Sequence, residues 1–282
     1  MLRKGYIMKI KYNKEIKWHI VFIIIILILL YPILYALSTS FKSLNEAYNN
    51  ILSLIPEKPT TSAYKRVLSI IPFARITLNT FIIASVVTLF KLFTSILAAY
   101  SFVFFDFKGK KVLYFILIST IFIPFTVTMI PNYITVSRLG LKDNILGVAL
   151  PQLADATGIF LLRQHMRGIP KSLLEVAKLE KTPQITILRT IVVPIIRPAI
   201  LSIGIIFFIN SWNEYVWPSL ILKSTDNYTL SLALQMFVSS EGGTDIPVAM
   251  AISVLTMMLP LVLYAICQKY IINTFAQSGI KG

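Results

Sequence analysis

Long apolar runs separated by short polar segments dominate the chain. A helix needs roughly 20 mostly apolar residues, at about 1.5 Å of rise each, to cross a bilayer. Six stretches reach about this length and are bounded by charged residues, Pro or Gly: about 20–40, 76–104, 112–136, 145–165, 195–222 and 247–270. The pattern predicts an all-α integral membrane protein with six transmembrane helices.

Composition supports the membrane assignment. Hydrophobic residues make up 56% of the 282 positions, charged residues only 14%, and the mean hydropathy is +0.76, which is outside the usual range of soluble domains. The net charge of +15 comes from short basic segments between apolar runs, a distribution typical of topology signals. We therefore expect a lipid bilayer and no nucleic acid as partner. Cys267, His19 and His165 lack ligand partners at suitable spacing, so we expect no metal site.

The basic residues also predict an orientation. Of the 27 Lys and Arg residues, 18 fall in segments that are cytoplasmic if both termini lie inside. No clear cleavage site follows the first apolar run, which indicates a retained span rather than a signal peptide. The predicted organisation begins with a cytoplasmic tail (1–19), a first span (20–40) and an external loop (41–75). A core of five helices that includes the loop 168–194 follows (76–270), and a second cytoplasmic tail ends the chain (271–282).

The cytoplasmic loop 168–194 has a helical pattern of its own. Ser172 and Glu175 have the spacing of a capping box at a helix start. Pro183 disfavours helical backbone at Thr182, and together these two residues suit the start of a second helix. We therefore expect two short helices that meet near residues 181–183. Taken alone, the pattern also fits a basic amphipathic helix lying on the lipid surface.

These residues resemble a known motif. Glu175-Val-Ala177, then Lys181, then Ile191-Val-Val-Pro194 are similar to the EAA loop of ATP-binding-cassette (ABC) importer permeases, whose pattern is Glu-Ala-Ala, Gly at place seven and Ile-x-Leu-Pro at places 17 to 20. The blocks LAAYSFVFFDFKGKK, IPNYITVSRLGLKDNILGVALPQL, SWNEYVWPSLIL and QKYIINTFAQSGIKG extend the resemblance over roughly residues 70–282. Together they look like the MalG-type permeases of the carbohydrate-uptake branch.

The resemblance implies the fold and assembly of a type I ABC importer permease in the bacterial plasma membrane. It implies a second permease subunit as heterodimer partner, an ATPase dimer and an extracellular solute-binding protein. It further implies that the loop docks in a cleft of the ATPase, which makes six residues the candidates for coupling: Ser172, Glu175, Ala177, Lys181, Thr182 and Pro194. The sequence contains no P-loop, so we expect a transport subunit without enzymatic activity or cofactor, with ATP bound by the partner.

The chain departs from the family pattern at four places: Val176, Glu180, Lys181 and Asn273. The Gly usual at the place of Lys181 is expected to leave the first helix in a left-handed conformation, which costs a lysine about 1 kcal/mol. Thr182 and Pro183 offer a second way to break the helix. We therefore expect the bend to persist.

Polar side chains inside the predicted spans suggest a translocation path, because an ionisable group in the membrane is costly unless it is paired or hydrated. The candidates are Lys91, Asp155, Trp212, Asn213 and Glu214. Alternatives are a Lys91–Asp155 pair that only holds helices together, interhelical hydrogen bonds from Asn213 and Glu214, and ordinary packing of Trp212.

Two other functions fit a membrane protein of this kind. A stand-alone secondary transporter or channel would show internal inverted repeats or broken helices in two halves, and neither is visible in the sequence. An intramembrane enzyme would need a catalytic constellation, and the sequence has neither G-x-S-x-G nor H-E-x-x-H. The sequence thus favours the permease subunit of an importer for a sugar, an oligosaccharide or a solute resembling glycerol phosphate.

Overall fold

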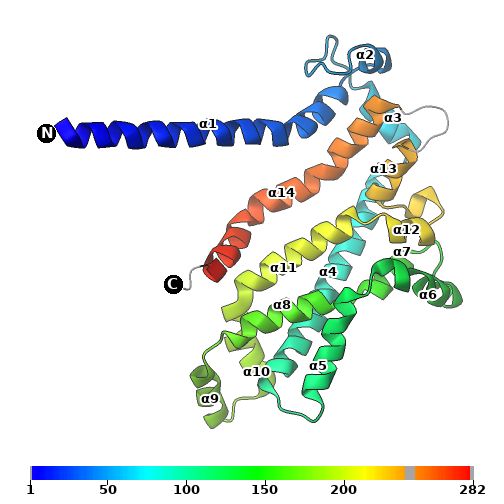
Figure 1. The fold of residues 1–282 in the computed structure, drawn as a ribbon. Coiled ribbons are helices and arrows are strands. Elements are labelled where there is room, and N and C mark those ends of the chain that lie inside the picture. The colour runs from blue at the N-terminus through cyan, green and yellow to red at the C-terminus, as the bar shows by residue number, and fades with distance from the viewer. Residues whose placement is uncertain (1, 239–244, 280–282) are drawn as a thin grey trace. The chain divides into compact units, whose positions relative to one another are not determined.

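The structure, a computed structural model, describes residues 2–238 and 245–279, which form helices joined by turns and loops without strands (Figure 1). The chain divides into two compact units, residues 1–70 with 236–255, and residues 71–235 with 256–282. Two helices contribute to both units: α13 (Leu230–Val238) and α14 (Ile246–Gly279). The predicted all-helical fold is confirmed.

Membrane-spanning helices are of two kinds. Among the residues that the structure describes, four helices are long and apolar enough to span a membrane by themselves: Ile16–Thr39, Phe73–Phe104, Gln184–Asn213 and Ile246–Ile266. Two bent pairs of helices pass the same test of length and composition together: Lys110–Phe122 with Phe125–Arg138 at 99° and Ile145–Gln152 with Ala156–Arg167 at 44°. Counting each bent pair as one span gives the six predicted from hydropathy.

The bends have local causes that a hydropathy window does not register. Pro124 has extended backbone and is the N-cap of the helix after the first break, where its missing N–H leaves no donor to continue the preceding helix. Asp155 is the N-cap after the second break, again with extended backbone. The predicted spans 112–136 and 145–165 are therefore each two helices rather than one.

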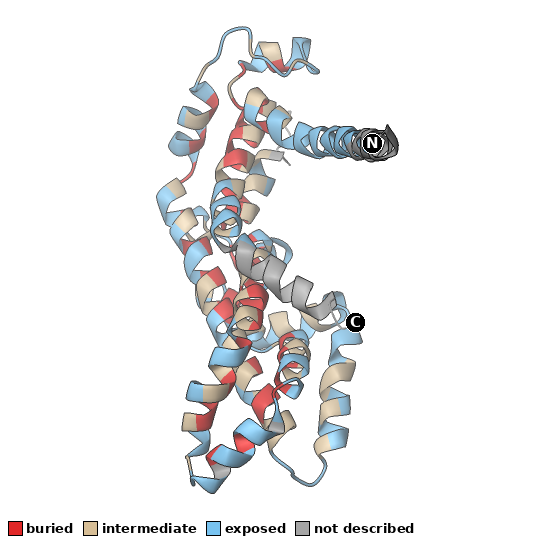
Figure 2. Cartoon of the chain, turned by 90° about the vertical axis from the view of Figure 1, so that its left-hand side faces the viewer, coloured by how far each residue is buried: buried red, intermediate tan, exposed pale blue. Residues whose placement is uncertain are grey.

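The first unit contains α1 (Leu2–Thr39), α2 (Leu44–Asn49), α3 (Ser62–Ile70) and the beginning of α14. Helix α1 extends through most of the predicted tail 1–19 without a break. The side chains of residues 16–34 are exposed (Figure 2). Because most of them are apolar, this surface suits contact with lipid chains or with another transmembrane helix.

A buried lysine organises the loop that follows α1. The side chain of Lys42 is fully buried, and its Nζ donates to the carbonyl oxygens of Asn50 at 3.0 Å and Ser53 at 2.6 Å. Ser40 Oγ and Tyr64 Oη share a hydrogen bond of 2.8 Å within the same unit. These bonds give the predicted loop 41–75 an ordered structure, including helices α2 and α3.

The second unit is built around α4 (Phe73–Phe104), which packs along α8 (Ala156–Arg167) and α11 (Val193–Asn213). Before α13, the second unit also contains α5 (Lys110–Ser119), η1 (Thr120–Phe122), α6 (Phe125–Arg138), α7 (Ile145–Ala149), η2 (Leu150–Gln152), α9 (Lys171–Leu179), α10 (Gln184–Ile187), the π-helical turn η3 (Leu188–Val192), α12 (Val216–Ile221) and η4 (Thr225–Asn227). One apolar cluster surrounds the C-terminal half of α4, and another surrounds its N-terminal half. Helix α4 therefore connects the two ends of this unit.

Candidate functional site

The loop 168–194 forms the predicted pair of helices, α9 and α10, with a bend between them. Lys181 has a positive φ of 53°, and the N–H of Thr182 donates to the carbonyl of Ala177 at 3.0 Å. A left-handed residue followed by a bond that reaches back five residues is the Schellman way of ending a helix, and glycine usually occupies that position. Lys181 therefore adopts the conformation expected of the family's glycine.

The loop is anchored to the core by one face only. Leu174 and Ala177 of α9, with Ile187 of α10 and Leu188 of η3, join the apolar cluster formed by α4, α8 and α11. The opposite side of α9 exposes three apolar side chains: Leu173, Val176 and Leu179. Packing fixes the inner face, and the outer face is available to a partner.

The other predicted coupling residues lie on the surface of this loop. Helix α9 begins at Lys171, so Ser172 occupies its second position rather than the cap that the sequence predicted. Ser172 and Glu175 are exposed, and their side chains make no hydrogen bond within the described part of the chain. Pro183, not Thr182, is the N-cap of α10, and Pro194 is the exposed second residue of α11.

Replacing Lys181 with glycine should stabilise the bend by about 1 kcal/mol, because glycine adopts a positive φ without steric cost. We expect amide hydrogen exchange at the end of α9 to slow about fivefold. Glu180→Gly is the matched control, since no positive φ is found at Glu180 and the substitution only adds backbone freedom. Equal exchange in Lys181→Gly and the wild type would contradict this account.

The structure pairs Lys91 with Asp155, two of the candidates for the translocation path. Lys91 Nζ lies 3.1 Å from Asp155 Oδ2, and the two side chains are 16% and 23% exposed. Asp155 Oδ1 accepts hydrogen bonds from the N–H groups of Thr157 at 2.8 Å and Gly158 at 3.1 Å. Lys91 also faces the ring of Phe207, whose centroid is 5.1 Å from Nζ. Both carboxylate oxygens of Asp155 therefore have partners within the chain.

The remaining path candidates lie together at the end of α11. Trp212 is buried, and its Nε1 donates to the carbonyl of Thr256 at 3.0 Å, which makes this ring a packing anchor. Glu214 follows the helix, and its Oε1 accepts from the N–H groups of Val216 at 2.9 Å and Trp217 at 3.2 Å. Asn213 is exposed. Glu214 is seven residues beyond Phe207, roughly 10 Å along the helix, so this group is separate from the Lys91–Asp155 pair.

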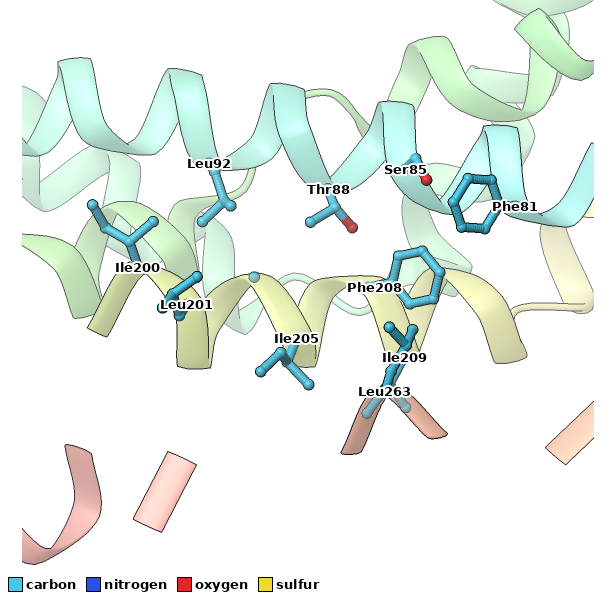
Figure 3. Close-up of a pocket in the computed structure, with 11 residues that line it drawn as sticks. Phe81, Ser85, Thr88, Leu92, Ile200, Leu201, Ile205, Phe208, Ile209 and Leu263 are labelled. Atoms are coloured by element: carbon cyan, nitrogen blue, oxygen red, sulfur yellow. The ribbon is translucent and has the colours of Figure 1, made fainter. Parts of the chain in front are cut away.

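A cavity of about 310 Å³ opens between α4 and α11 (Figure 3). Its wall includes Phe81, Leu92 and Phe208, and among its lining residues only Ser85 and Thr88 carry polar side chains. None of the predicted path residues lines it. A wall of this kind suits apolar chains and offers few partners for the hydroxyl groups of a sugar.

Comparison with known proteins settles the family. A family model described as "Binding-protein-dependent transport system inner membrane component" matches residues 91–276. The chain belongs to this family. The match includes the loop 168–194, the Lys91–Asp155 pair and the end of α11. As a member of this family with several apolar helices, the protein is a multi-pass transport subunit of the bacterial plasma membrane.

Full-length relatives in this permease family are similar to the chain throughout. The sn-glycerol-3-phosphate transport system permease protein UgpE of Pectobacterium atrosepticum is 27% identical over 267 residues, which cover 92% of this chain and 95% of UgpE. The arabinooligosaccharides transport system permease protein AraQ of Halalkalibacterium halodurans is 27% identical over 281 residues, covering 98% and 100%.

Solved structures give the same result for the fold. A chain of a bacterial ABC transporter involved in the import of the acidic polysaccharide alginate matches with a TM-score of 0.80 and 26% identity, covering 90% of this chain and 95% of that one. A chain from a bacterial alginate ABC transporter in complex with alginate pentasaccharide-bound periplasmic protein matches with a TM-score of 0.67 and 16% identity, covering 92% and 94%. The second likeness concerns the fold alone.

Asp143 is a structural residue of this permease that the sequence did not single out. It has a positive φ of 53°, a conformation that Asp and Asn tolerate better than most residues. Its Oδ1 accepts from the N–H groups of Lys223 at 2.9 Å and Ser224 at 3.0 Å, and Asn227 Nδ2 donates to its carbonyl. These hydrogen bonds, first those from the backbone of Lys223 and Ser224, hold the pKa of Asp143 well below its usual range. Asp143 thereby ties the turn before α7 to the segment after α12.

Replacing Asp143 with asparagine should cost about 1 kcal/mol at pH 7, because the amide oxygen keeps the acceptor position but loses the charge that strengthens the bonds. A carboxyl whose pKa is lowered by folding contributes stability above its unfolded pKa of about 4, and this contribution is lost as the pH falls through its folded pKa. The difference in melting temperature between the wild type and the Asp143→Asn variant should therefore become smaller below about pH 4. The exposed Asp106 supplies the control Asp106→Asn, and a pH-independent gap at Asp143 would exclude the charge as its cause.

Proposed function

We propose that this chain is a permease subunit of an ATP-driven importer for a carbohydrate or a related polyol phosphate. The names of its relatives support this class of solute, since UgpE belongs to an sn-glycerol-3-phosphate transport system, AraQ to an arabinooligosaccharide transport system and the solved relative to an alginate importer. These solutes all carry hydroxyl groups on neighbouring carbon atoms.

The geometry of the loop 168–194 is the observation that carries the proposal. Its inner face packs into the core of α4, α8 and α11, while Leu173, Val176 and Leu179 are exposed on the outer face of α9. Exposed Glu175 lies on the same helix, and its carboxylate has no hydrogen bond inside the described part of the chain. An apolar strip with an unpaired charge beside it suits a protein partner, and in this family the partner is an ATPase.

The rest of the assembly follows from the same proposal. Two ATPase subunits bind ATP, a second permease completes the membrane path, and an extracellular binding protein delivers the solute. In the N-in and C-in orientation that the basic residues predict, the loop 168–194 lies on the cytoplasmic side with the ATPase. Asn213 and Glu214 remain the better candidates for the path, because Asn213 is exposed and the second carboxylate oxygen of Glu214 has no hydrogen bond within the described residues.

Purification of the tagged chain from its own organism tests the assembly. We expect an ATPase, a second permease and a binding protein to co-purify with it. Glu175→Ala should leave the stability of the chain within about 0.5 kcal/mol of wild type, because the side chain is exposed and unpaired. It should lower ATPase recovery about tenfold, the effect of losing roughly 1.4 kcal/mol of binding free energy. Glu180→Ala serves as the control beyond the helix end, and a fully active transporter without an ATPase would establish a stand-alone carrier instead.

Uptake by the purified assembly in liposomes tests the solute class. Three probes represent the chemistry of the relatives: sn-glycerol 3-phosphate, an arabino-oligosaccharide and an alginate oligosaccharide. ATP-dependent accumulation of at least one, with competition by its unlabelled form, is the expected result. An assembly that hydrolyses ATP but accumulates none of the three would reject the carbohydrate class and leave the ATP-driven mechanism standing.

A further inference from the structure

Tyr100 places a hydroxyl group where the loop 168–194 meets α4. Its side chain is only 5% exposed and lies in the apolar cluster that surrounds the loop. The hydroxyl donates to Gln184 Oε1 at 2.7 Å, with the backbone carbonyl of Gln184 3.4 Å away as a second acceptor. Gln184 is the first residue of α10, directly after the bend. A directional bond therefore ties the second helix of the loop to α4.

The two ends of α10 are held differently. At its start, the Tyr100 hydroxyl adds a hydrogen bond of fixed geometry to the apolar contacts of Ile187. At its end, the chain enters α11 through the π-helical turn η3. Such turns are rare overall but are found frequently at functional sites. Pro194 follows this turn and has no N–H to bond back to Thr190. The joint to α11 therefore lacks one backbone hydrogen bond of a regular helix, although α10, η3 and α11 follow one another in the continuous helix Gln184–Asn213.

Helix α4 carries a second contact that matters for motion. Lys91 lies nine residues before Tyr100, about 14 Å along the same helix, and pairs with Asp155 at the break between η2 and α8. A displacement of α10 that moves α4 would therefore reach the hinge of the fourth span. The same displacement would also reach α11 through η3, so α4 is a second route besides the helix Gln184–Asn213.

We propose that Tyr100 is the positioning residue that transmits movement of the loop 168–194 to α4, and through Lys91 to the break before α8. This inference rests on the proposed function, because it assumes that an ATPase moves the loop. Tyr100 belongs to the LAAYSFVFF block, and neither hydropathy nor the loop motif predicts this role for it. Loss of the Tyr100 hydroxyl should leave the loop docked while weakening the transfer of its movement.

The test measures solute accumulated per ATP hydrolysed by the complete transporter in liposomes, with a probe that the wild type accumulates. Tyr100→Phe should lower this ratio by about fivefold to tenfold, the range expected for one lost hydrogen bond. ATPase recovery should equal that of wild type, and the melting temperature should fall only slightly, because the exposed Gln184 side chain can bond to water instead. Gln184→Ala should behave similarly, whereas Gln184→Glu keeps an acceptor oxygen and should retain the ratio. Tyr114→Phe is the matched control, because the buried hydroxyl of Tyr114 has no hydrogen-bond partner in the described chain.

The possible outcomes separate this inference from the proposed function. An unchanged ratio in Tyr100→Phe would overturn the inference, as would a ratio lowered equally by Tyr114→Phe. Loss of the ATPase from the Tyr100→Phe assembly would also overturn it, because the hydroxyl would then shape the docking surface rather than transmit movement. A wild-type chain that binds no ATPase would overturn the proposed function itself, and the inference with it.

Discussion

Replacing Gly158 with alanine should destabilise the permease by about 3 kcal/mol, at the upper end of the usual cost of overpacking a core. A Cβ at this position would lie 2.6 Å from Ser95 Oγ and 2.7 Å from Phe207 Cζ, far inside normal contact distances. Ser95 is fully buried on α4 and Phe207 is buried on α11, so neither can retreat into solvent. The Phe207 ring also faces Lys91, so its displacement would disturb the ion pair. Thermal unfolding of the detergent-solubilised chain measures the loss.

Gly168→Ala is the matched control for Gly158. The nearest atom to a Cβ at Gly168 would be the carbonyl oxygen of His165 at 3.4 Å, an acceptable distance, and the expected change is within about 0.5 kcal/mol. Adding Ser95→Ala to Gly158→Ala removes the shorter of the two clashes and should recover part of the loss. If the Gly158→Ala protein had the same melting temperature as the wild type, α4, α8 and α11 would separate more easily than their packing indicates.

Local sequence signals predicted the parts of this fold that depend on neighbouring residues. The apolar runs predicted the spans, because burial in lipid requires length and composition together. Pro183 and the place of Lys181 in the motif predicted a bend between two short helices, and Lys181 adopts the left-handed backbone whose cost was anticipated. Each of these features is determined by a few adjacent residues, so a single sequence is enough to see it.

The breaks within the third and fourth spans were beyond the reach of hydropathy. A window average hardly changes when one residue leaves the helix, so neither Pro124 nor Asp155 was predicted to interrupt its span, although Asp155 was noticed as a charge. The start of α9 shows a related limit. Ser172 and Glu175 have the spacing of a capping box, yet the helix begins at Lys171 and leaves Ser172 inside the first turn. Position relative to the helix start decides which side chain can cap it, and the spacing alone does not fix that start.

The candidate site was predictable as a set of residues and not as an arrangement. Lys91 and Asp155 attracted attention as charges in apolar spans, and their pairing was one of the alternatives that the sequence left open. No local signal could decide it, because the two positions lie 64 residues apart in the chain. Tyr100 carried no signal at all, because an aromatic residue in an apolar run is indistinguishable from ordinary packing. Contacts between distant helices depend on the rotation of each helix about its axis, and the breaks at Pro124 and Asp155 change that rotation.

Replacing Asp155 with alanine should destabilise the chain by roughly 4 kcal/mol, because the carboxylate has two structural tasks. One oxygen neutralises Lys91 in partly buried surroundings, where we expect loss of one partner to cost about 3 kcal/mol, the low end of the range for buried pairs. The other caps α8 through the N–H groups of Thr157 and Gly158, a contribution of about 1 kcal/mol. Asp155→Asn keeps an oxygen for the cap and removes only the charge, so it should lie between alanine and wild type. Thermal unfolding and detergent-extracted yield measure the series.

Exchange of the two charges distinguishes the pair from the cap. If the ion pair were the whole contribution, Lys91→Asp combined with Asp155→Lys would restore the stability that each single reversal loses. A lysine at position 155 cannot accept hydrogen bonds from Thr157 and Gly158. We therefore expect the double variant to regain the stability contributed by the ion pair, while its free energy of unfolding stays about 1 kcal/mol or more below that of wild type. Complete recovery would mean that the cap contributes nothing. Absence of any recovery, with Asp155→Asn as stable as wild type, would mean that the pair contributes nothing and that Lys91 is neutralised by other means.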